Sequence, residues 1–343
     1  MKLNDFDFAL PDESIARYPA SPRDHSRLLV SRRSVSELTH AHFFELGDYL
    51  REGDLLVLND TKVLPARLNG IDPSHRTFEA LILEPRPGDP LCWKSLLKPG
   101  KKANPGLRIA FPFDVSAVVE TANGSFWLHF SGPHLDPHPL AFLEWLSTAG
   151  VPPLPPYLKR RATEEDRTSY QTVYASKPGS VAAPTAGLHF TQPLLDELTQ
   201  LGVDLGTVTL RLGYGTFAPI RSDHVEEHVM HEETYCIPED IPEKIARTRA
   251  RGGRVIAVGT TALRALESLA HQGREGTTRL FIRPGYQFRN IDGLLTNFHL
   301  PKSSLYVLVA ALLGIERARE VYAAGIAEGY RFYSYGDAML ILD

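Results

Sequence analysis

The chain of 343 residues contains only two cysteines, Cys92 and Cys236, which lie far apart and outside any CxxC motif. Their number and spacing exclude a disulfide framework and a thiolate zinc site at the level of sequence pattern. Long hydrophobic runs are also absent, since the longest, Leu305 to Ile315, has about half of the roughly 20 residues that a membrane span needs. The opening segment has no apolar core of signal-peptide length, so we expect a cytoplasmic protein that does not enter the membrane.

An excess of positive charge is absent as well. The chain has 37 Lys and Arg residues against 41 Asp and Glu residues, which gives a formal net charge of −4. This balance excludes a globally basic nucleic-acid coat, so an RNA partner would have to be held by a local patch. The hydrophobic fraction of 43% and the charged fraction of 23% are typical of a globular protein rather than a disordered one.

Two patterns along the chain predict a discontinuous domain organisation. Between residues 63 and 135, short alternating segments are separated by turns rich in Gly, Pro and Asn, which is typical of a small antiparallel barrel or sandwich. From Tyr170 onward, apolar strand candidates alternate with helix candidates, which favours an α/β fold whose partly parallel sheet is open or closed into a barrel. We therefore predict an α/β domain over residues 1–62 and 136–343, with a small β domain over residues 63–135 inserted into it.

Polar side chains gather at six ends of the predicted strands. Each position alone has an ordinary explanation, since Asp60 suits a turn and Thr260 or Thr261 suits a helix N-cap. In α/β folds, however, ligands collect where the loops after the strands converge. Six such ends together indicate a polar site, whose candidate residues are Asn59, Asp60, Thr185, His189, Arg211, Thr216, Thr260, Thr261, Asn297, His299, Ser334, Tyr335 and Asp337.

Some of these positions also indicate a particular chemistry. Arg211 is predicted inside an apolar strand, where a half-buried arginine normally requires an anionic partner. The helix predicted to start at Thr260 and Thr261 offers free N–H groups and a positive dipole end to a carboxylate or phosphate. His189 and His299 are either core histidines or groups with the pKa range that proton transfer requires.

The histidines of the segment DHVEEHVMHEE have two open interpretations. The spacing of His224, His228 and His231 would place all three on one helical face, as in a metal site. The segment is not an HExxH motif and has no other compact ligand set nearby, so polar substrate contacts or an exposed helix face are the alternatives, and we predict no metal.

Two basic clusters are open to interpretation in the same way. They either face solvent or contact RNA, and no RRM, KH or zinc-knuckle signature accompanies them. Their members are Lys98, Lys101, Lys102, Lys159, Arg160 and Arg161. The residues alone therefore predict an α/β enzyme with an inserted small β domain and a polar site.

The chain closely resembles the S-adenosylmethionine:tRNA ribosyltransferase-isomerases of queuosine synthesis in six segments, YQTVYASKPGSVAAPTAGLHFT, LGYGTFAPIR, HVMHEETY, VIAVGTTALRALES, LLTNFHLP and YRFYSYGDAML. The earlier segments LPDESIARYPASPRDHSRLL and GDLLVLNDTKVLPARL are similar to the family as well. The similar segments run from residue 10 to 342, and the predicted insertion contains no family motif. The resemblance implies a barrel-like α/β main domain with an inserted small antiparallel β-barrel.

The resemblance also implies a reaction. The ribosyl group of S-adenosylmethionine is transferred onto 7-aminomethyl-7-deazaguanine at the wobble position of a tRNA with a GUN anticodon. Adenine and methionine leave, and the product is epoxyqueuosine-tRNA. S-adenosylmethionine is then a consumed co-substrate, and neither a cofactor, a metal nor a membrane is expected; we expect a monomer.

The implied chemistry assigns roles to the candidate residues. The candidate general acids and bases are Asp60, His189, His299 and Asp337, and the sequence does not assign which of them is the acid and which the base. The substrate-binding set is Asn59, Thr185, Arg211, Thr216, His228, His231, Thr260, Thr261, Arg264, Asn297, Ser334 and Tyr335, within which Thr185, Thr260, Thr261 and Arg264 are candidates for the methionine carboxylate. The two basic clusters are the candidates for tRNA binding. A metal-dependent hydrolase that uses His224, His228 and His231, and a non-catalytic tRNA-binding protein, are the alternative functions.

Overall fold

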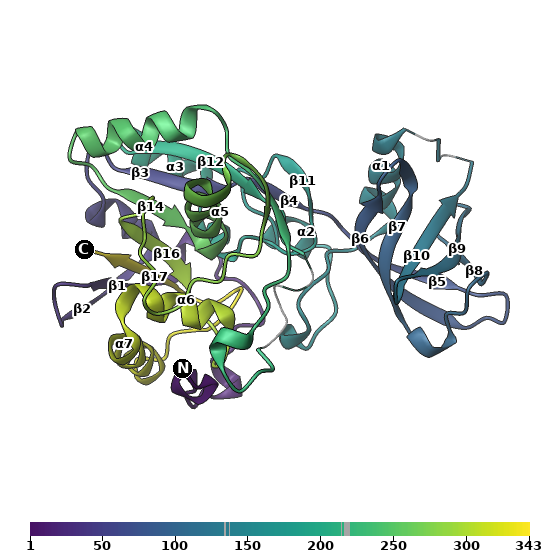
Figure 1. The fold of residues 1–343 in the computed structure, drawn as a ribbon, viewed down its shortest axis with the longest axis horizontal. Coiled ribbons are helices and arrows are strands. Elements are labelled where there is room, and N and C mark those ends of the chain that lie inside the picture. The colour runs from purple at the N-terminus through teal and green to yellow at the C-terminus, as the bar shows by residue number, and fades with distance from the viewer. Residues whose placement is uncertain (134, 137, 214, 216–219) are drawn as a thin grey trace.

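Nine strands form one mixed sheet that organises the larger part of the described molecule (Figure 1). The computed structural model describes residues 1–133, 135–136, 138–213, 215 and 220–343. Across the sheet, the strands follow one another in the order β15 (Glu275–Thr278), β13 (Glu233–Cys236), β12 (Asp204–Leu210), β3 (Leu55–Asn59), β14 (Val255–Val258), β16 (Gly293–Asn297), β17 (Ala338–Leu342), β1 (Arg27–Arg32) and β2 (Leu38–His42).

The middle of this sheet is parallel, and its margins are antiparallel. β3 pairs in parallel with β12 and β14, and β14 pairs in parallel with β16. β17 pairs antiparallel with β16 and parallel with β1, while β2, β13 and β15 join through antiparallel pairs. The partly parallel sheet that the alternation of strands and helices predicted is confirmed. The apolar residues 280–282 form no strand. The edge strand β15 forms earlier in the chain, and the carbonyl of Leu280 accepts a hydrogen bond from Arg264 Nε at 3.0 Å.

Strand β3 shows why helices cover both faces of the sheet. All five residues of its sequence LLVLN are buried. Leu55 and Val57 belong to one hydrophobic core and Leu56 and Leu58 to another, because successive side chains of a strand point to opposite faces. The helices that join the first core are α4 (Asp240–Ala250), α5 (Gly259–Gln272), α6 (Ser304–Leu313) and α7 (Ile315–Ala327), and those that join the second are α3 (Gln192–Gln200) and the 3-10 helix η4 (Phe43–Tyr49).

Six antiparallel strands close into a separate small barrel (Figure 1). Around the barrel they are β10 (Ser125–Ser131), β7 (Asp89–Lys98), β6 (Thr77–Arg86), β5 (Arg67–Ile71), β8 (Arg108–Phe111) and β9 (Val115–Ala122). The inserted antiparallel β-barrel is thereby confirmed. Helix α1 (Pro139–Ala149) shares the barrel core, since the ring of Phe142 stacks on Trp93 with centroids 4.7 Å apart. The domain boundaries stay a prediction, and this packing favours ending the inserted unit after Ala149 rather than at residue 135.

Short elements connect the two units. β4 (Thr61–Val63) and β11 (Lys177–Ser180) form a parallel two-stranded sheet between the main sheet and the barrel (Figure 1).

The remaining described helices are short and are spread along the chain. They are α2 (Asp166–Ser169), η1 (Leu3–Phe6), η2 (Asp12–Ser14), η3 (Arg23–His25), η5 (Gly100–Lys102), η6 (Pro156–Leu158), η7 (Thr185–His189) and η9 (Val225–Glu227). None of the helices that the structure describes combines the length and the apolarity that crossing a bilayer requires.

One buried ion pair fastens the start of two central strands. The carboxylate of Asp54, which is fully buried before β3, accepts hydrogen bonds from the backbone N–H of Arg254 at 2.8 Å and from its guanidinium. We expect Asp54→Ala to lower the free energy of unfolding by about 3–5 kcal/mol, because it leaves a buried guanidinium without its counterion. Urea unfolding measures this change. Glu239→Ala is the control, because Glu239 forms an exposed ion pair with Arg274. Equal stabilities of the two variants would contradict it.

Candidate active site

A cavity lies at the carboxyl ends of β14 and β16, beside the start of helix α5. This is the edge at which open α/β sheets bind ligands. The empty space amounts to about 520 Å³, part of it open to solvent. The residues that line it are Tyr157, Ala182, Ala183, Pro184, Thr185, Ala186, Leu212, Gly259, Thr260, Thr261, Thr296, Asn297, His299, Leu305, Tyr333 and Ser334.

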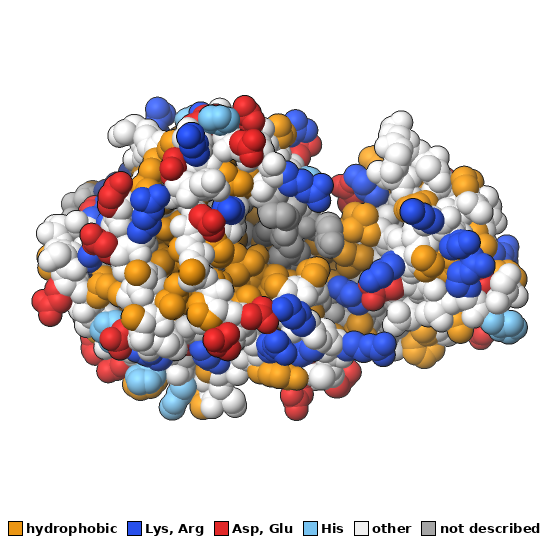
Figure 2. All heavy atoms as spheres, turned by 90° about the horizontal axis from the view of Figure 1, so that it is seen from below, with side chains coloured by type: hydrophobic (Ala, Val, Ile, Leu, Met, Phe, Trp, Pro, Cys, Tyr) orange, Lys and Arg blue, Asp and Glu red, His pale blue; other side chains and the backbone are white. Residues whose placement is uncertain are grey.

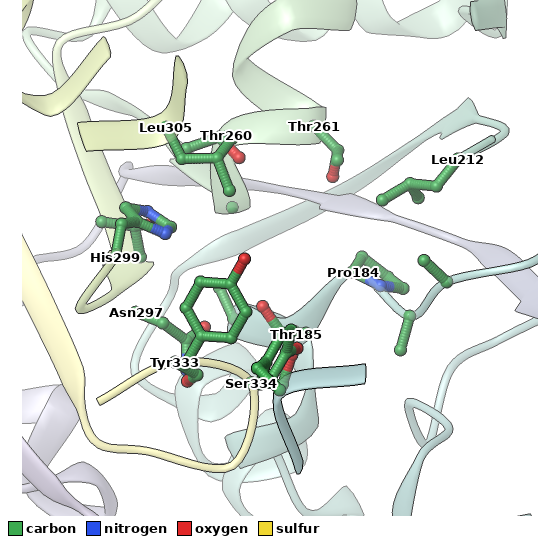
Figure 3. Close-up of a pocket in the computed structure, with 16 residues that line it drawn as sticks. Pro184, Thr185, Leu212, Thr260, Thr261, Asn297, His299, Leu305, Tyr333 and Ser334 are labelled. Atoms are coloured by element: carbon green, nitrogen blue, oxygen red, sulfur yellow. The ribbon is translucent and has the colours of Figure 1, made fainter. Parts of the chain in front are cut away.

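The labelled residues face one common space (Figure 3). Thr260, Thr261 and Leu305 lie on one side of it, and Asn297 and Tyr333 lie on the other. Six of the predicted site residues therefore come together in this cavity, namely Thr185, Thr260, Thr261, Asn297, His299 and Ser334.

The start of helix α5 forms one wall of the cavity. Gly259 is the first helical residue and has a φ of +86°, which an L side chain rarely adopts, so glycine suits the sharp turn from β14 into the helix. The first backbone N–H groups of a helix have no partner within it, and the positive end of the helix dipole lies there. The wall at Thr260 and Thr261 can therefore bind an anionic group.

Asn59 holds this wall in place without lining the cavity. Its Nδ2 donates to Thr261 Oγ1 at 3.1 Å and to the carbonyl of Leu210 at 3.0 Å. Its Oδ1 accepts from the backbone N–H groups of Thr61 and Leu210, at 3.2 and 3.0 Å. The predicted binding residue Asn59 thus ties β3, β12 and α5 together, and its effect on a ligand passes through Thr261.

His299 is the titratable histidine that faces the cavity. Its Nε2 lies 2.9 Å from Thr296 Oγ1, and its backbone N–H donates to the hydroxyl of Tyr322 at 3.1 Å, so the ring is held in one orientation. Burial lowers the pKa of His299 to about 3. The imidazole is consequently neutral near pH 7.

His189 lies behind the cavity wall rather than in it. Its Nδ1 is 2.7 Å from Ser26 Oγ, and its Nε2 is 3.1 Å from Nδ2 of Asn297. Burial, and then the charges of Arg331 and Arg23, lower the pKa of His189 to about 3. The neutral ring accepts a hydrogen bond from the Asn297 amide and so fixes its orientation. The structure therefore places His189 as a positioning residue.

Asn297 has an acceptor left over for a ligand. Its Nδ2 donates to His189 and to the carbonyl of Tyr333 at 3.1 Å. Its Oδ1 is buried and has no hydrogen-bond partner within the described part of the chain. A buried carbonyl oxygen without a donor is costly, so this atom is suited to accept from a ligand hydroxyl or amine.

Asp60 and Arg211 lie outside the cavity. The carboxylate of Asp60 accepts from Thr209 Oγ1 at 2.6 Å and from Ser176 Oγ at 2.8 Å. The prediction of a half-buried Arg211 inside a strand is wrong, because β12 ends at Leu210 and the Arg211 side chain is exposed. The alternation of β12 continues through Arg211 to the buried Leu212, so Arg211 lies on the less buried side of this alternation.

Asp337 and Tyr335 also point away from the cavity. The carboxylate of Asp337 accepts from the backbone N–H groups of Arg27 and Arg331, at 3.1 and 2.7 Å, and from the Arg331 guanidinium, which fastens the turn before β17. The hydroxyl of Tyr335 donates to Asp166 at 2.9 Å. Both residues hold the chain that carries Ser334. The predicted binding residue Thr216 lies outside the described residues.

Two tyrosines of the cavity are absent from the predicted set. The ring of Tyr157 meets that of Tyr333 edge-on, with centroids 3.8 Å apart, and its hydroxyl is hydrogen-bonded to Ser334. Tyr333 adopts a φ of +76°, which is strained for a non-glycine residue. Burial raises the pKa of both phenols, so they are neutral. Tyr157 lies in the proline-rich connector, where no periodicity marks it, whereas Tyr333 directly precedes the predicted Ser334.

A second cavity adjoins the first and shares Thr260, Thr261 and Leu305 with it. It is also lined by the predicted residues Arg264, His228 and His231. The helix expected for the histidine segment is wrong, since only the short η9 (Val225–Glu227) forms. Within the described ranges, no three His, Cys, Asp or Glu side chains are placed to hold a metal ion, so the histidines do not assemble the ligand set of a metal-dependent hydrolase.

The two predicted basic clusters differ in whether their side chains are paired with acidic residues of the protein. Lys98, Lys101 and Lys102 are exposed on the barrel, and Arg161 is exposed on the main body. Lys159 Nζ, in contrast, lies 2.7 Å from Asp12 Oδ1. Arg160 grips both oxygens of the buried Asp166, at 2.6 and 2.7 Å.

The environment of Asp166 confirms that its pair with Arg160 is internal to the fold. Burial by itself would raise the pKa of Asp166, but hydrogen bonds from Arg160, the Thr163 N–H and Tyr335 outweigh it and lower the pKa to about 2. The guanidinium of Arg160 is thus occupied by a structural partner and is a poor candidate for a phosphate contact.

Fold and site together define an α/β enzyme with a polar ligand cavity at the carboxyl ends of parallel strands and an inserted β-barrel. The sequence model of a family described as queuosine biosynthesis protein matches residues 3–341. The chain is 47% identical over 346 residues to the S-adenosylmethionine:tRNA ribosyltransferase-isomerase of Citrifermentans bemidjiense, which covers 99% of this chain and 100% of the relative. It is 50% identical over 345 residues to the protein of the same name from Gloeobacter violaceus, with 98% and 95% covered.

A solved structure agrees with these relatives. The crystal structure of an S-adenosylmethionine tRNA ribosyltransferase from Thermotoga maritima is 35% identical in sequence and has a TM-score of 0.56, with 98% of this chain and 100% of that chain covered. The chain therefore belongs to the queuosine biosynthesis family, in which the two relatives above are ribosyltransferase-isomerases, and the resemblance is confirmed. Because this is a family of enzymes, a purely tRNA-binding role without catalysis is not supported.

Proposed function

We propose that this enzyme transfers and isomerises the ribosyl moiety of S-adenosylmethionine onto 7-aminomethyl-7-deazaguanine at the wobble position of a tRNA with a GUN anticodon. The products are epoxyqueuosine-tRNA, adenine and methionine. The observation that carries this proposal is that five of the segments that resemble the family, far apart in the sequence, contribute residues to one cavity. S-adenosylmethionine is consumed as a co-substrate, and the proposal includes neither a cofactor nor a metal. The enzyme is proposed to act as a cytoplasmic monomer.

The cavity supplies the groups that such a reaction needs. A sulfonium acidifies the neighbouring ribose methylene, so a positioned base can remove a proton there. Of the predicted catalytic residues, His299 is the one that lines the cavity, and its ring is neutral and held by Thr296, so we assign it this role. The free Oδ1 of Asn297 suits a ribose hydroxyl or the incoming amine. The predicted catalytic residues Asp60 and Asp337 are engaged with the protein, and this argues for His299 as the base.

Chromatography of the reaction products tests this function. Incubating the enzyme with S-adenosylmethionine and a GUN tRNA that carries the deazaguanine precursor should release adenine and methionine in equal amounts. The same tRNA with unmodified guanine at the wobble position is the control, because it lacks the aminomethyl nucleophile. Absence of adenine with the precursor-bearing tRNA would refute the proposed function.

An exposed basic strip between the main body and the barrel is better placed for tRNA than Lys159 or Arg160. It consists of Lys62 on β4, Lys177 on β11 and Arg211 after β12, and no ion pair is described for any of these side chains. The Arg211 side chain lies along Gly179, where an added Cβ would come within 2.9 Å of its Nε. In Figure 1, β4 and β11 lie between the body and the barrel, and Figure 2 shows Lys and Arg side chains gathered around this narrow region.

Charge reversal tests the strip against the barrel lysines. We expect the double variant Lys62→Glu, Lys177→Glu to bind tRNA more weakly and to reduce the slope of log affinity against log salt by about 1 for each phosphate that a lysine no longer neutralises. Lys98→Glu, Lys101→Glu is the matched control on the barrel, with filter binding at several salt concentrations as the measurement. If the barrel variant has the reduced slope and the strip variant keeps the wild-type slope, the barrel lysines bind tRNA and the strip is wrong.

A further inference from the structure

The second cavity contains a charged group that the fold leaves partly unused. Arg264 on α5 is buried, with 6% of its side chain exposed. Its Nε donates to the carbonyl of Leu280 at 3.0 Å, and its Nη1 forms an ion pair with the equally buried Glu233. Its Nη2 is buried too and has no hydrogen-bond partner among the residues that the structure describes.

Such an atom indicates a missing acceptor. Buried guanidinium groups are normally fully hydrogen-bonded, since an unpaired donor loses its water without compensation. The hydrogen bonds to Leu280 and Glu233 fix the orientation of the Arg264 guanidinium, so Nη2 cannot rotate toward another acceptor without breaking them. The N-terminal wall of α5 at Thr260 and Thr261 adds further positive potential in the same cavity. The acceptor that fits is a carboxylate.

The relation of the two cavities indicates which carboxylate. They share Thr260, Thr261 and Leu305, so the two cavities adjoin, and a substrate that spans both has its two ends on either side of this common wall. S-adenosylmethionine has that form, a nucleoside joined through a sulfonium to an amino acid. Burial and the neighbouring His231 lower the pKa of His228, so near pH 7 its ring is neutral and does not repel an ammonium group.

We propose that the second cavity is the amino-acid subsite of the enzyme, in which Nη2 of Arg264 binds the methionine carboxylate of S-adenosylmethionine. The adenosine and ribose then occupy the first cavity, which His299 lines. This inference rests on the proposed function, because it takes S-adenosylmethionine as the substrate. Its consequence is that the fold anchors the end of the substrate that leaves as methionine, separately from the end that reacts.

A pair of ligands tests the subsite without tRNA. Decarboxylated S-adenosylmethionine keeps the adenosine and the sulfonium but lacks the carboxylate. By calorimetry, the wild-type enzyme should bind S-adenosylmethionine at least about tenfold more tightly than the decarboxylated compound, as expected for a charge-assisted hydrogen bond in a buried site. Equal affinities for the two ligands would overturn the proposal, whatever the variants do.

The variant Arg264→Lys keeps a positive charge beside Glu233 but loses the planar fork of the guanidinium. It should bind the two ligands with nearly equal affinity. Arg254→Lys is the matched control, because Arg254 forms a similarly buried pair with Asp54 at the opposite end of β14. If Arg264→Lys keeps the wild-type preference, or Arg254→Lys loses it to the same extent, Arg264 does not recognise the carboxylate.

A steric variant covers the case in which Arg264→Lys fails to fold. Ser304 lines the second cavity but not the first, so Ser304→Phe should fill only the former. It should weaken binding of S-adenosylmethionine at least about tenfold and leave that of 5′-methylthioadenosine, which has no amino-acid portion, unchanged. Equal losses for both ligands would overturn the subsite. The adenine-release assay on the wild-type enzyme is independent of these ratios, so failure of the proposed function and failure of the subsite are distinguishable.

Discussion

Replacing His299 by glutamine is expected to slow adenine release by about 10²–10⁴-fold, while the affinity for S-adenosylmethionine changes little. Glutamine can keep a hydrogen bond to Thr296, but it cannot accept the proton that the ribose methylene must lose. Because the group acts on the transition state, kcat should fall and KM should stay close to the wild-type value. Single-turnover measurement of adenine, with binding measured separately by calorimetry, checks both parts.

The control for this prediction is a histidine outside the cavity. His40 is exposed, and its Nδ1 lies 2.9 Å from the hydroxyl of Tyr330, so His40→Gln should leave the rate unchanged. Washout of deuterium from the ribose methylene of labelled S-adenosylmethionine gives a second readout, which should disappear in His299→Gln. A variant at His299 that retains the wild-type rate and washout would show that another group removes the proton.

The second large effect is expected on stability in mild acid. Burial lowers the pKa of both His189 and His299 to about 3, whereas an unfolded histidine titrates near 6.5. Between these pKa values the unfolded chain binds more protons than the folded one, so stability is lost as the pH falls from about 6.5 toward about 3. Each histidine contributes up to about 1.4 kcal/mol per pH unit, and the free energy of unfolding at pH 5 should be roughly 4 kcal/mol below that at pH 7.

Urea unfolding at pH 7, 6 and 5 measures this loss. In His189→Gln, one of the two titrating groups is gone, so the decline with pH should be about half as steep as in the wild type. His271→Gln is the control, because His271 is exposed. An identical pH dependence in wild type and His189→Gln would mean that His189 does not resist protonation in the folded state. Asp166 contributes separately, because its lowered pKa reduces the free energy of unfolding only as the pH falls below about 4.

The segments that the sequence identifies best are those whose own residues determine their structure. β3 has the uninterrupted apolar run LLVLN, and α3 has Thr191 as its N-cap and a proline in its first turn. β15 is missed because its sequence EGTT has no apolar residue, and it becomes a strand only by pairing with β13. The histidine segment is mistaken for a helix because its spacing is periodic, although long-range contacts such as the bridge from Lys2 to His224 extend the chain.

The candidate site shows the same division. Sequence reasoning places Thr185, Thr260, Thr261, Asn297 and His299 after strands and Ser334 just before the last strand, and all six line the cavity. It cannot show that Asp60 and Asp337 turn to hydroxyl and N–H donors of the protein, because those donors are supplied by segments far away in the chain. Tyr157 joins the site from an irregular connector, for which no periodic pattern exists.

By itself, the sequence determined the family, the α/β class, the inserted β unit and the polar segments at the strand ends, because these depend on motifs, periodicity and turn residues that are local. The tertiary structure alone decided which side chains face the cavity and which are hydrogen-bonded within the protein and stabilise its walls. The direction of a side chain depends on the partners that strand pairing and core packing bring to it, as Asn59 behind Thr261 and the free Nη2 of Arg264 illustrate.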